Sequence, residues 1–374
     1  MRIPLSSPDL SEADIVAATA VLRTTQLSLG PKLEEFERAL GTYLGAREVV
    51  AVSSGTSALH LSLCALHVQE GDEVIVPSFA FIAVANAVRY LNAIPVFVDV
   101  QPRTLNLDPE KIESAISPRT KAIIVVHTFG VPAEIDRIRE IATRRQLFLV
   151  EDSCEALGAE YRGRRTGVIG DVGVFGFYPN KQITTGEGGA FITQDPEIAA
   201  RVRSLRNHGR TAAQNWLQHE EIGYNYRVSE MNCALGLSQL ARLDSILKRR
   251  SQVAETYHRH LQGQDGLQPP ALEIAWGKIS WFVYVVRLAP ESSSEDRDWI
   301  LAEMERRGIG CGRYFAPIHL QPAYRGTPHR CMDLTVTESI ARRTLALPFF
   351  NTISPEQIAE VCAALLELTQ KRRR

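Results

Sequence analysis

Short apolar runs alternate with helical segments over the first half of the chain. From Glu48 onward, runs that are apolar throughout are followed by stretches whose apolar residues recur at helical spacing. The runs are Val49–Val52, Glu73–Val76, Ile94–Val98, Ala122–Val126 and Leu147–Val150, and the helical segments lie near 57–67, 81–91, 109–115 and 133–145. This alternation predicts an α/β fold in which a mostly parallel central sheet is covered by helices on both faces. Ligands of such folds bind at the carboxyl ends of the strands.

The segments outside this alternation predict a second, smaller domain. Residues 1–45 are typical of an arm followed by helices, and Leu33–Leu44 carries an apolar face. After Thr193 we expect helices at 196–206, 229–260, 294–307 and 355–369, and a strand at 279–288. We therefore expect a large domain over 46–262 and a smaller α+β domain over 263–374, with residues 1–45 packing against the smaller domain.

Composition narrows the range of partners. The 374 residues carry a net charge of −1, which gives no electrostatic reason to expect nucleic acid or a membrane surface as the main partner. No run of about 18 apolar residues occurs, and the N-terminus lacks the layout of a signal peptide. The six cysteines are scattered without a C-x-x-C pair, which argues against a zinc site or a disulfide framework and favours the cytoplasm.

A lone lysine follows the buried run Val172–Phe177. Lys181 stands before a loop of small residues, Thr184-Thr-Gly-Glu-Gly-Gly189. A lysine held in a partly dry pocket can attack a carbonyl through its neutral amine and form a Schiff base. The alternative is a lysine at a strand end that extends to water.

Two earlier strand ends carry candidate contacts for a phosphate and a flat ring. Ser53–Ser57 follows a strand and opens a helix, so the amides of Gly55, Thr56 and Ser57 and the hydroxyls of Thr56 and Ser57 could hold a phosphate. A simple Ser/Thr helix cap is the other interpretation. Neither G-x-G-x-x-G nor G-x-x-x-x-G-K-S occurs at this position, which argues against nucleotide folds of those kinds. Phe81 is a candidate to stack on a cofactor ring, whereas Phe79 is expected in the core.

A carboxylate completes the pattern. The run from Leu147 ends in Glu151 and Asp152, and a buried carboxylate at such a position needs a cationic partner. An aspartate can keep a pyridine nitrogen protonated, a lysine can bind an aldehyde, and a helix end can bind a phosphate. Pyridoxal phosphate (PLP) has all of these groups. With the ring protonated, the freed Lys181 amine would move the substrate proton as base and acid.

Several stretches together resemble a known family. They are Gly30-Pro31, Ser54–Thr56, Pro77–Phe81, Val96–Val100, Val126–Gly130, Glu151–Gly158, Phe177–Gly189, Gly223–Arg227 and His319–Tyr324. In combination they resemble the sugar aminotransferases of the DegT/DnrJ/EryC1/StrS family, within PLP fold type I, over nearly the whole chain.

The resemblance implies a role for each matching residue. Lys181 resembles the Schiff-base lysine and Asp152 the partner of the ring nitrogen. Gly55, Thr56 and Ser57 resemble phosphate binders, and Phe81 resembles the ring stacker. Asn225 matches a segment that in the family reaches the phosphate of the other subunit, which implies a homodimer with shared sites. Tyr314, His319 and Tyr324 fall in the region that resembles the nucleotide-sugar pocket, although each could also be a core or rim residue.

The chain departs from the family pattern at a few positions. Gly176 replaces a serine whose hydroxyl often contacts the phosphate, and Tyr178 replaces a histidine. Glu155 stands where the family commonly has glutamine or histidine facing the cofactor's phenolic oxygen. Because two negative charges would repel there, we predict that Glu155 is protonated or turned toward a donor. Lys181 argues against the family branch that carries histidine at this position and dehydrates the sugar.

These observations predict a PLP-dependent aminotransferase. The expected reaction moves an amino group, from L-glutamate, onto a keto group of a nucleotide-linked deoxysugar in aminosugar biosynthesis. A keto-cyclitol acceptor remains open, because the acceptor pocket is built from loops. A regulatory or binding protein with the same fold is a further alternative, against which the intact Lys181 and Asp152 argue. A nicotinamide dehydrogenase lacks support, because the glycine fingerprint is absent.

Overall fold

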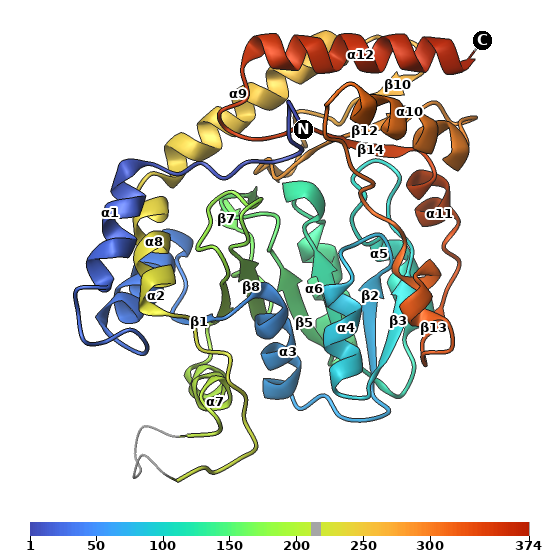
Figure 1. Ribbon diagram of the computed structural model, residues 1–374. Coiled ribbons are helices and arrows are strands. Elements are labelled where there is room, and N and C mark those ends of the chain that lie inside the picture. Colours follow the sequence, from blue (N-terminus) through green and yellow to red (C-terminus); the bar gives the residue numbers. More distant parts are fainter. Residues whose placement is uncertain (211–217, 374) are drawn as a thin grey trace.

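The computed structural model describes residues 1–210 and 218–373, which form a large domain and a smaller domain that lies over one end of it (Figure 1). A mixed sheet is the centre of the large domain. Its strands run in the order β1 (Glu48–Val52), β9 (Gly189–Thr193), β8 (Val172–Gly176), β5 (Phe148–Asp152), β4 (Thr120–Val126), β2 (Glu73–Pro77), β3 (Ile94–Val98) and β13 (Arg330–Cys331). The strands are parallel except β9, which is antiparallel to both β1 and β8. The predicted α/β fold with a mostly parallel sheet is confirmed.

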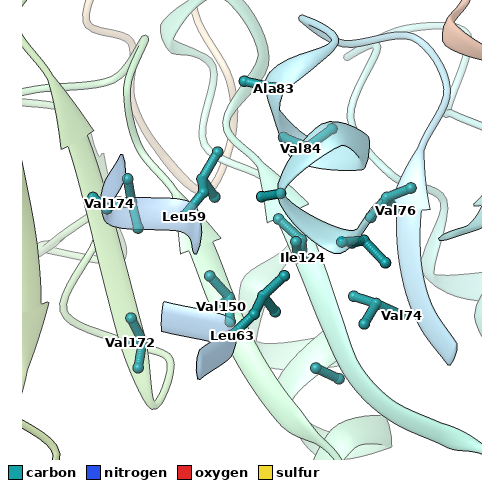
Figure 2. Packing of buried hydrophobic residues seen from close by; sticks show 14 of the residues in the cluster. Leu59, Leu63, Val74, Val76, Ala83, Val84, Ile124, Val150, Val172 and Val174 are labelled. Atoms are coloured by element: carbon teal, nitrogen blue, oxygen red, sulfur yellow. The ribbon is translucent and has the colours of Figure 1, made fainter. Parts of the chain in front are cut away.

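Helices cover both faces of this sheet. One face carries α3 (Gly55–Ala65), α4 (Ala83–Tyr90) and α7 (Pro196–Arg206), and the other carries α5 (Pro109–Ile112), the 3-10 turn η1 (Glu113–Ala115) and α6 (Ile135–Arg145). Val74 and Val76 pack with Leu59 and Leu63 of α3, whereas Ile75 between them belongs to the opposite cluster (Figure 2). Because side chains alternate between faces, a continuous apolar run is what a strand buried on both sides requires.

The antiparallel strand β9 was not expected from the sequence. It returns directly beside β8, with Gly176 opposite Gly189. Glycines at its start weaken the strand pattern, since glycine is depleted in strands. The lysine loop therefore joins two neighbouring antiparallel strands.

The N-terminal helices differ from the prediction in what they contact. α1 (Glu12–Val21) and α2 (Pro31–Leu44) exist, but both pack on α8 (Glu230–Ala241), and α2 also packs on β1 of the large-domain sheet (Figure 1). The apolar face of α2, which includes Phe36 and Leu40, lies in one cluster with Phe175. The contact expected with the smaller domain is made instead by the arm, where Ile3 is part of that domain's core. The expected packing of residues 1–45 is therefore corrected for the helices.

The long helix expected at 229–260 is two helices. α8 ends at Ala241, and α9 (Leu243–Leu261) follows after a break at Arg242, which bonds Asp9 and Asp14 of the N-terminal segment. α9 starts against the large domain with Ile246 and continues into the core of the smaller domain with Tyr257. The boundary at 262 therefore follows a helix that both domains share, and the division remains a prediction.

The smaller domain is built on the antiparallel strands β10 (Leu267–Gln268), β12 (Tyr284–Leu288) and β14 (Thr344–Leu347). Its helices are α10 (Ser294–Arg306), α11 (Thr335–Ala341) and α12 (Pro355–Arg373), and α10 and α12 pack together. The remaining elements are β6 (Glu160–Tyr161), β7 (Arg164–Arg165), β11 (Gly277–Lys278), η2 (Thr128–Gly130), η3 (Ile318–Leu320) and η4 (Pro322–Tyr324). Within the described residues, no helix combines the length and the apolar character that crossing a bilayer requires.

The strand expected at 279–288 is shorter in the structure, because only Tyr284–Leu288 pairs as β12. The residues just before β12 contact the large domain instead. There the Ser280 N–H donates to the Gly130 carbonyl at 3.0 Å. Gly130 has a φ of +86°, and a Cβ there would lie 1.7 Å from the Ser280 oxygen. Only glycine permits this close approach.

Candidate active site

The amino end of α3 presents open backbone amides at the carboxyl end of β1. Ser54 caps the helix, because its Oγ accepts the Ser57 N–H at 3.0 Å, and the Ser57 hydroxyl lies 2.8 Å from the same atom. The N–H groups of Gly55 and Thr56 have no acceptor among the described residues. The cap and the anion site are therefore compatible: Ser57 belongs to the cap, while Gly55 and Thr56 keep donors for an anion.

Gly55 and Gly176 lie against each other, with the sulfur of Cys154 beside both. A Cβ on Gly55 would lie 2.8 Å from Cys154 Sγ, and a Cβ on Gly176 would lie 3.3 Å from it. The end of β8 is therefore beside the amino end of α3. A serine at position 176 would reach the phosphate cradle only if the sulfur shifted.

Asp152 ends β5 and is buried with one carboxylate oxygen available. Its Oδ1 accepts the Cys154 N–H at 3.0 Å, and its other oxygen has no hydrogen bond to the described residues. Asp152 is 7% exposed, so water would screen a charged partner at this oxygen only weakly. Asp152 therefore fits a partner that brings a proton.

Glu151, the neighbouring carboxylate, is fully occupied by hydrogen bonds within the protein. It accepts His127 Nε2–H at 2.9 Å and the N–H groups of Gly167 and Ile169. His127 Nδ1 accepts the Ala133 N–H at 3.1 Å, so the proton is on Nε2. Burial pushes the pKa of Glu151 up, but these hydrogen bonds outweigh it and leave the pKa below its ordinary value. Only Asp152 of this pair remains for chemistry.

Lys181 lies in the loop between β8 and β9 with its side chain largely buried. Its Nζ is 3.9 Å from Glu155 Oε1 and 3.9 Å from the centroid of the Phe282 ring. A lysine that extends to water would lack such neighbours. The structure therefore has the partly dry setting expected for a reactive amine.

Glu155 has the donor that the sequence called for. Its Oε2 accepts the Phe129 N–H at 2.8 Å. Burial raises the pKa of Glu155 to about 7, against the opposing effects of Lys181 and of this N–H. Phe129 has a φ of +57°, a left-handed conformation that costs a residue with a side chain about 1 kcal/mol. This unfavourable backbone conformation accompanies an N–H that donates to the Glu155 carboxylate.

Three residues near this rim are exposed. Phe81 is 62% exposed and Tyr178 is 53% exposed, both unusual for aromatic side chains. Asn225 is exposed too, and it forms an isolated bridge with Asn207 in its own chain. An open aromatic face on Phe81 is what a stacked ring would need.

The residues expected in a substrate pocket have different settings. The Tyr314 ring stacks with that of Phe282, with centroids 6.4 Å apart, and burial followed by the Glu155 charge raises its pKa. His319 is largely buried, with Nδ1 2.7 Å from Ser78 Oγ. Tyr324 is 2% exposed, and its hydroxyl donates to the Asn86 side chain at 3.0 Å. This burial and this hydrogen bond favour the other interpretation of Tyr324 given above, a core residue.

Sequence reasoning missed Phe129 and Phe282. A left-handed φ at a phenylalanine has no sequence signal. Phe282 lies in an apolar run that was interpreted as a strand, so its place beside the lysine depended on the path of the chain between the domains.

The residues present fit pyridoxal phosphate. The open amides of Gly55 and Thr56 suit its phosphate, the available oxygen of Asp152 suits a protonated ring nitrogen, and the Lys181 amine suits its aldehyde. These groups come from β1–α3, β5 and the β8–β9 loop, which meet at one edge of the sheet.

Comparison with known proteins gives the same assignment. A sequence profile of the DegT/DnrJ/EryC1/StrS aminotransferase family matches residues 8–366. The chain belongs to this family. GDP-perosamine synthase of Caulobacter vibrioides is 39% identical over 367 residues, covering 97% of each chain.

Solved structures agree with the fold of this aminotransferase. TlmJ, an aminotransferase from Streptoalloteichus hindustanus, has a TM-score of 0.93 at 33% identity, with each chain fully covered. The PLP form of Spr1654 from Streptococcus pneumoniae has a TM-score of 0.94 at 29% identity, and each chain is again fully covered. The protein is a PLP-dependent aminotransferase, and the fold class, cofactor and enzyme class predicted from the sequence are confirmed.

Proposed function

We propose that this aminotransferase moves an amino group from L-glutamate onto a keto group of a nucleotide-linked deoxysugar, as a step in making an amino sugar. The observation that carries the proposal is the meeting of Asp152, Lys181 and the open α3 amides at one edge of the sheet. A relative of almost the same length is a GDP-perosamine synthase, which supports a sugar nucleotide as acceptor.

Each residue then has a defined task. The open amides of Gly55 and Thr56 would hold the phosphate, beside Ser57 of the helix cap. Phe81 would stack on the ring, and Asp152 would keep a proton on the ring nitrogen. When bound, PLP withdraws electrons from the amino-bearing carbon of the substrate, which makes its proton easier to remove. Lys181 would hold the cofactor aldehyde, and its amine would move that proton as base and acid.

The first test uses the absorbance of the purified protein with PLP. Addition of L-glutamate should shift the violet band of the bound cofactor to the near ultraviolet, and Lys181→Ala should abolish the shift. A protein that binds PLP but ignores glutamate would contradict the proposed donor. A protein that takes up no PLP would support a non-catalytic binding role.

The second test identifies the acceptor. The glutamate-treated enzyme is mixed with nucleotide-linked 4-keto and 3-keto deoxysugars and, separately, with keto-cyclitols. Return of the violet band with a nucleotide sugar supports the proposal. Return with cyclitols alone would contradict it.

We also infer a cytoplasmic homodimer. All six cysteines are free, which supports a reducing compartment. Large apolar side chains are exposed on α1 and just after it, including Ile15, Val16 and Leu22, and others, Phe81 and Tyr178, are exposed beside the active site. Exposed apolar groups of this kind are typical of protein interfaces. A second copy of the chain would cover those on α1 and Tyr178, whereas Phe81 keeps a face for the cofactor ring.

Subunit complementation tests whether Asn225 serves the partner's site. Lys181→Ala and Asn225→Ala are each expected to be inactive alone. Random re-pairing makes half of the dimers mixed, and each mixed dimer has one intact site if Asn225 acts across the interface. Recovery of about a quarter of wild-type activity is therefore expected. No recovery, with mixed dimers present by native mass spectrometry, would place Asn225 in its own protomer's site.

A further inference from the structure

The Lys181 amine lies against an aromatic ring from another part of the chain. The Phe282 ring centroid is 3.9 Å from Nζ, and the side chain of Phe282 is 2% exposed. At this distance the negative face of the ring attracts an ammonium group and offers it no hydrogen-bond acceptor. The Glu155 carboxylate, 3.9 Å from Nζ, is the charged neighbour on the large-domain side.

Phe282 belongs to the segment that enters the small-domain sheet. Its neighbour Trp281 lies in the core of the small domain, while Phe282 packs with Phe79 and Phe129 at the junction of the two domains. The chain bends at Phe282, and the rings of Trp281 and Phe282 lie in different clusters, one in the small domain and the next beside the lysine.

Two sets of hydrogen bonds fix the backbone at this point. On the large-domain side, the Ser280 hydroxyl donates to the Leu157 carbonyl at 2.6 Å, and Gln182 Nε2 donates to both the Glu155 and the Ser280 carbonyls. Gln182 is the residue that follows the lysine, so the lysine loop and this segment are tied directly to each other.

On the other side, Arg250 of α9 holds the next carbonyls. Its Nε donates to the Trp281 carbonyl at 2.6 Å, and its Nη2 donates to the Phe282 carbonyl at 2.8 Å. Arg250 is buried, and a third nitrogen lies 3.3 Å from Asn351 Oδ1. A planar guanidinium that spans two consecutive carbonyls fixes the direction of the peptide between them.

We propose that Phe282 is a positioning residue for Lys181: its ring orients the free amine and excludes water from one face of it, and Arg250 holds the ring in place. The proposal rests on the assigned role of Lys181 as the reacting amine. It concerns the state in which the amine is free, when the lysine must move a proton and no covalent bond holds its end.

Phe282→Leu keeps an apolar side chain but removes the ring. Loss of the ring exposes the amine to water and removes its attraction for the charged form, so we expect the amine to react faster with outside reagents. We expect the opposite effect on the glutamate half-reaction, which depends on the orientation of the amine and should slow about tenfold. A cation–π contact in a desolvated setting supports an effect of this size.

The main readout uses the full chain without cofactor. Lys181 is methylated with formaldehyde and cyanoborohydride, and peptide mass spectrometry gives its rate relative to the exposed Lys278 in the same sample. Phe282→Leu should raise the Lys181 rate several-fold, and Phe282→Tyr, which restores a ring, should return it toward wild type. Arg250→Lys, which loses the planar fork, should raise it as well.

Phe349→Leu is the matched control. Phe349 is an equally buried ring of the small domain that packs on Arg250 but lies in a different cluster from Phe282. Phe349→Leu should lower the melting temperature about as much as Phe282→Leu does, but it should leave the Lys181 methylation rate unchanged. A methylation rate in folded Phe282→Leu equal to that of wild type, or raised equally in Phe349→Leu, would overturn the positioning role.

The failure of this proposal can be told apart from a failure of the proposed function. If wild type shows no spectral change with glutamate, the donor assignment fails while the methylation result stands by itself. If the spectral change occurs but Phe282→Leu matches wild type in both methylation and half-reaction rate, only the positioning role fails.

Discussion

Glu155 predicts a specific pH dependence of stability. Burial raises its pKa from the ordinary 4.5 to about 7 in the folded protein, and the unfolded chain has no such effect. Between these pH values the folded protein retains a proton that the unfolded chain has released. Stability therefore falls as pH rises through this window and is constant with respect to this group above about pH 7.

The size of the effect follows from the same shift. Each pKa unit corresponds to about 1.4 kcal/mol, so the full window is worth about 3 kcal/mol. At about 2.1 cal/mol/K per residue, the unfolding entropy of this chain of 374 residues is about 0.8 kcal/mol/K. Dividing the free-energy change by this entropy gives a shift of about 4 °C in melting temperature.

Glu155→Gln isolates this contribution, because glutamine is neutral throughout. The assay is thermal and urea unfolding of the cofactor-free protein at half-unit steps from pH 4.5 to 8. The wild type should lose about 3 kcal/mol relative to Glu155→Gln by pH 7.5, with no further loss above that pH. The glutamine variant should therefore be the more stable protein at neutral pH.

Glu73→Gln provides a control of opposite sign. Burial pushes the pKa of Glu73 up, but hydrogen bonds from Ser117 and Arg119 and the charge of Arg330 outweigh it and lower the pKa. The stabilisation from Glu73 is therefore lost as pH falls, so the wild type should gain stability relative to Glu73→Gln as pH rises from acid. A wild-type curve parallel to that of Glu155→Gln from pH 4.5 to 8 would refute the reasoning about Glu155.

Three further predictions concern packing. Gly130→Ala places a Cβ 1.7 Å from the Ser280 oxygen at a φ of +86°, so it should destabilise the protein by more than about 4 kcal/mol and open the segment near residue 280 to limited proteolysis. Gly176→Ser should weaken PLP binding through its contact with Cys154, and Gly176→Ser with Cys154→Ala should bind PLP more tightly than the single variant in equilibrium titration. Tyr324→Phe should lower stability by about 1 kcal/mol and leave the acceptor KM unchanged, whereas a raised KM would return Tyr324 to the substrate pocket.

The sheet could be predicted because its strands are buried on both faces. Val74, Ile75 and Val76 pack into two opposite clusters, and only a run without polar residues satisfies both. The strand β9 escaped prediction because it begins with glycine, and the break at Arg242 escaped because nothing in the local sequence stops a helix there. Both features depend on contacts with distant segments, which override local propensity.

The polar groups of the site could be predicted because each follows a strand. Asp152 and Gly55 come directly after recognisable apolar runs, and parallel strands bring such positions to one edge. The residues expected in the substrate pocket were harder to predict, because they lie on short turns near the junction of the domains. Tyr324 and His319 are close in sequence, yet Tyr324 is a core residue whose hydroxyl is bonded to Asn86.

The contact between the Lys181 amine and the Phe282 ring could not be predicted from the sequence, for a physical reason. A charged or reactive group can be picked out by its chemistry, but the ring beside it is one of many phenylalanines in apolar runs. Phe282 is placed by hydrogen bonds between residues far apart in the sequence. Ser280 donates to the Gly130 carbonyl, and Arg250 donates to the carbonyls of Trp281 and Phe282. Asp152, Lys181 and the open α3 amides belong to the large domain, and the Phe282 ring beside the amine comes from the segment that enters the small domain. A substitution that displaces the Phe282 ring would therefore affect Lys181, even where no residue of the large domain is altered.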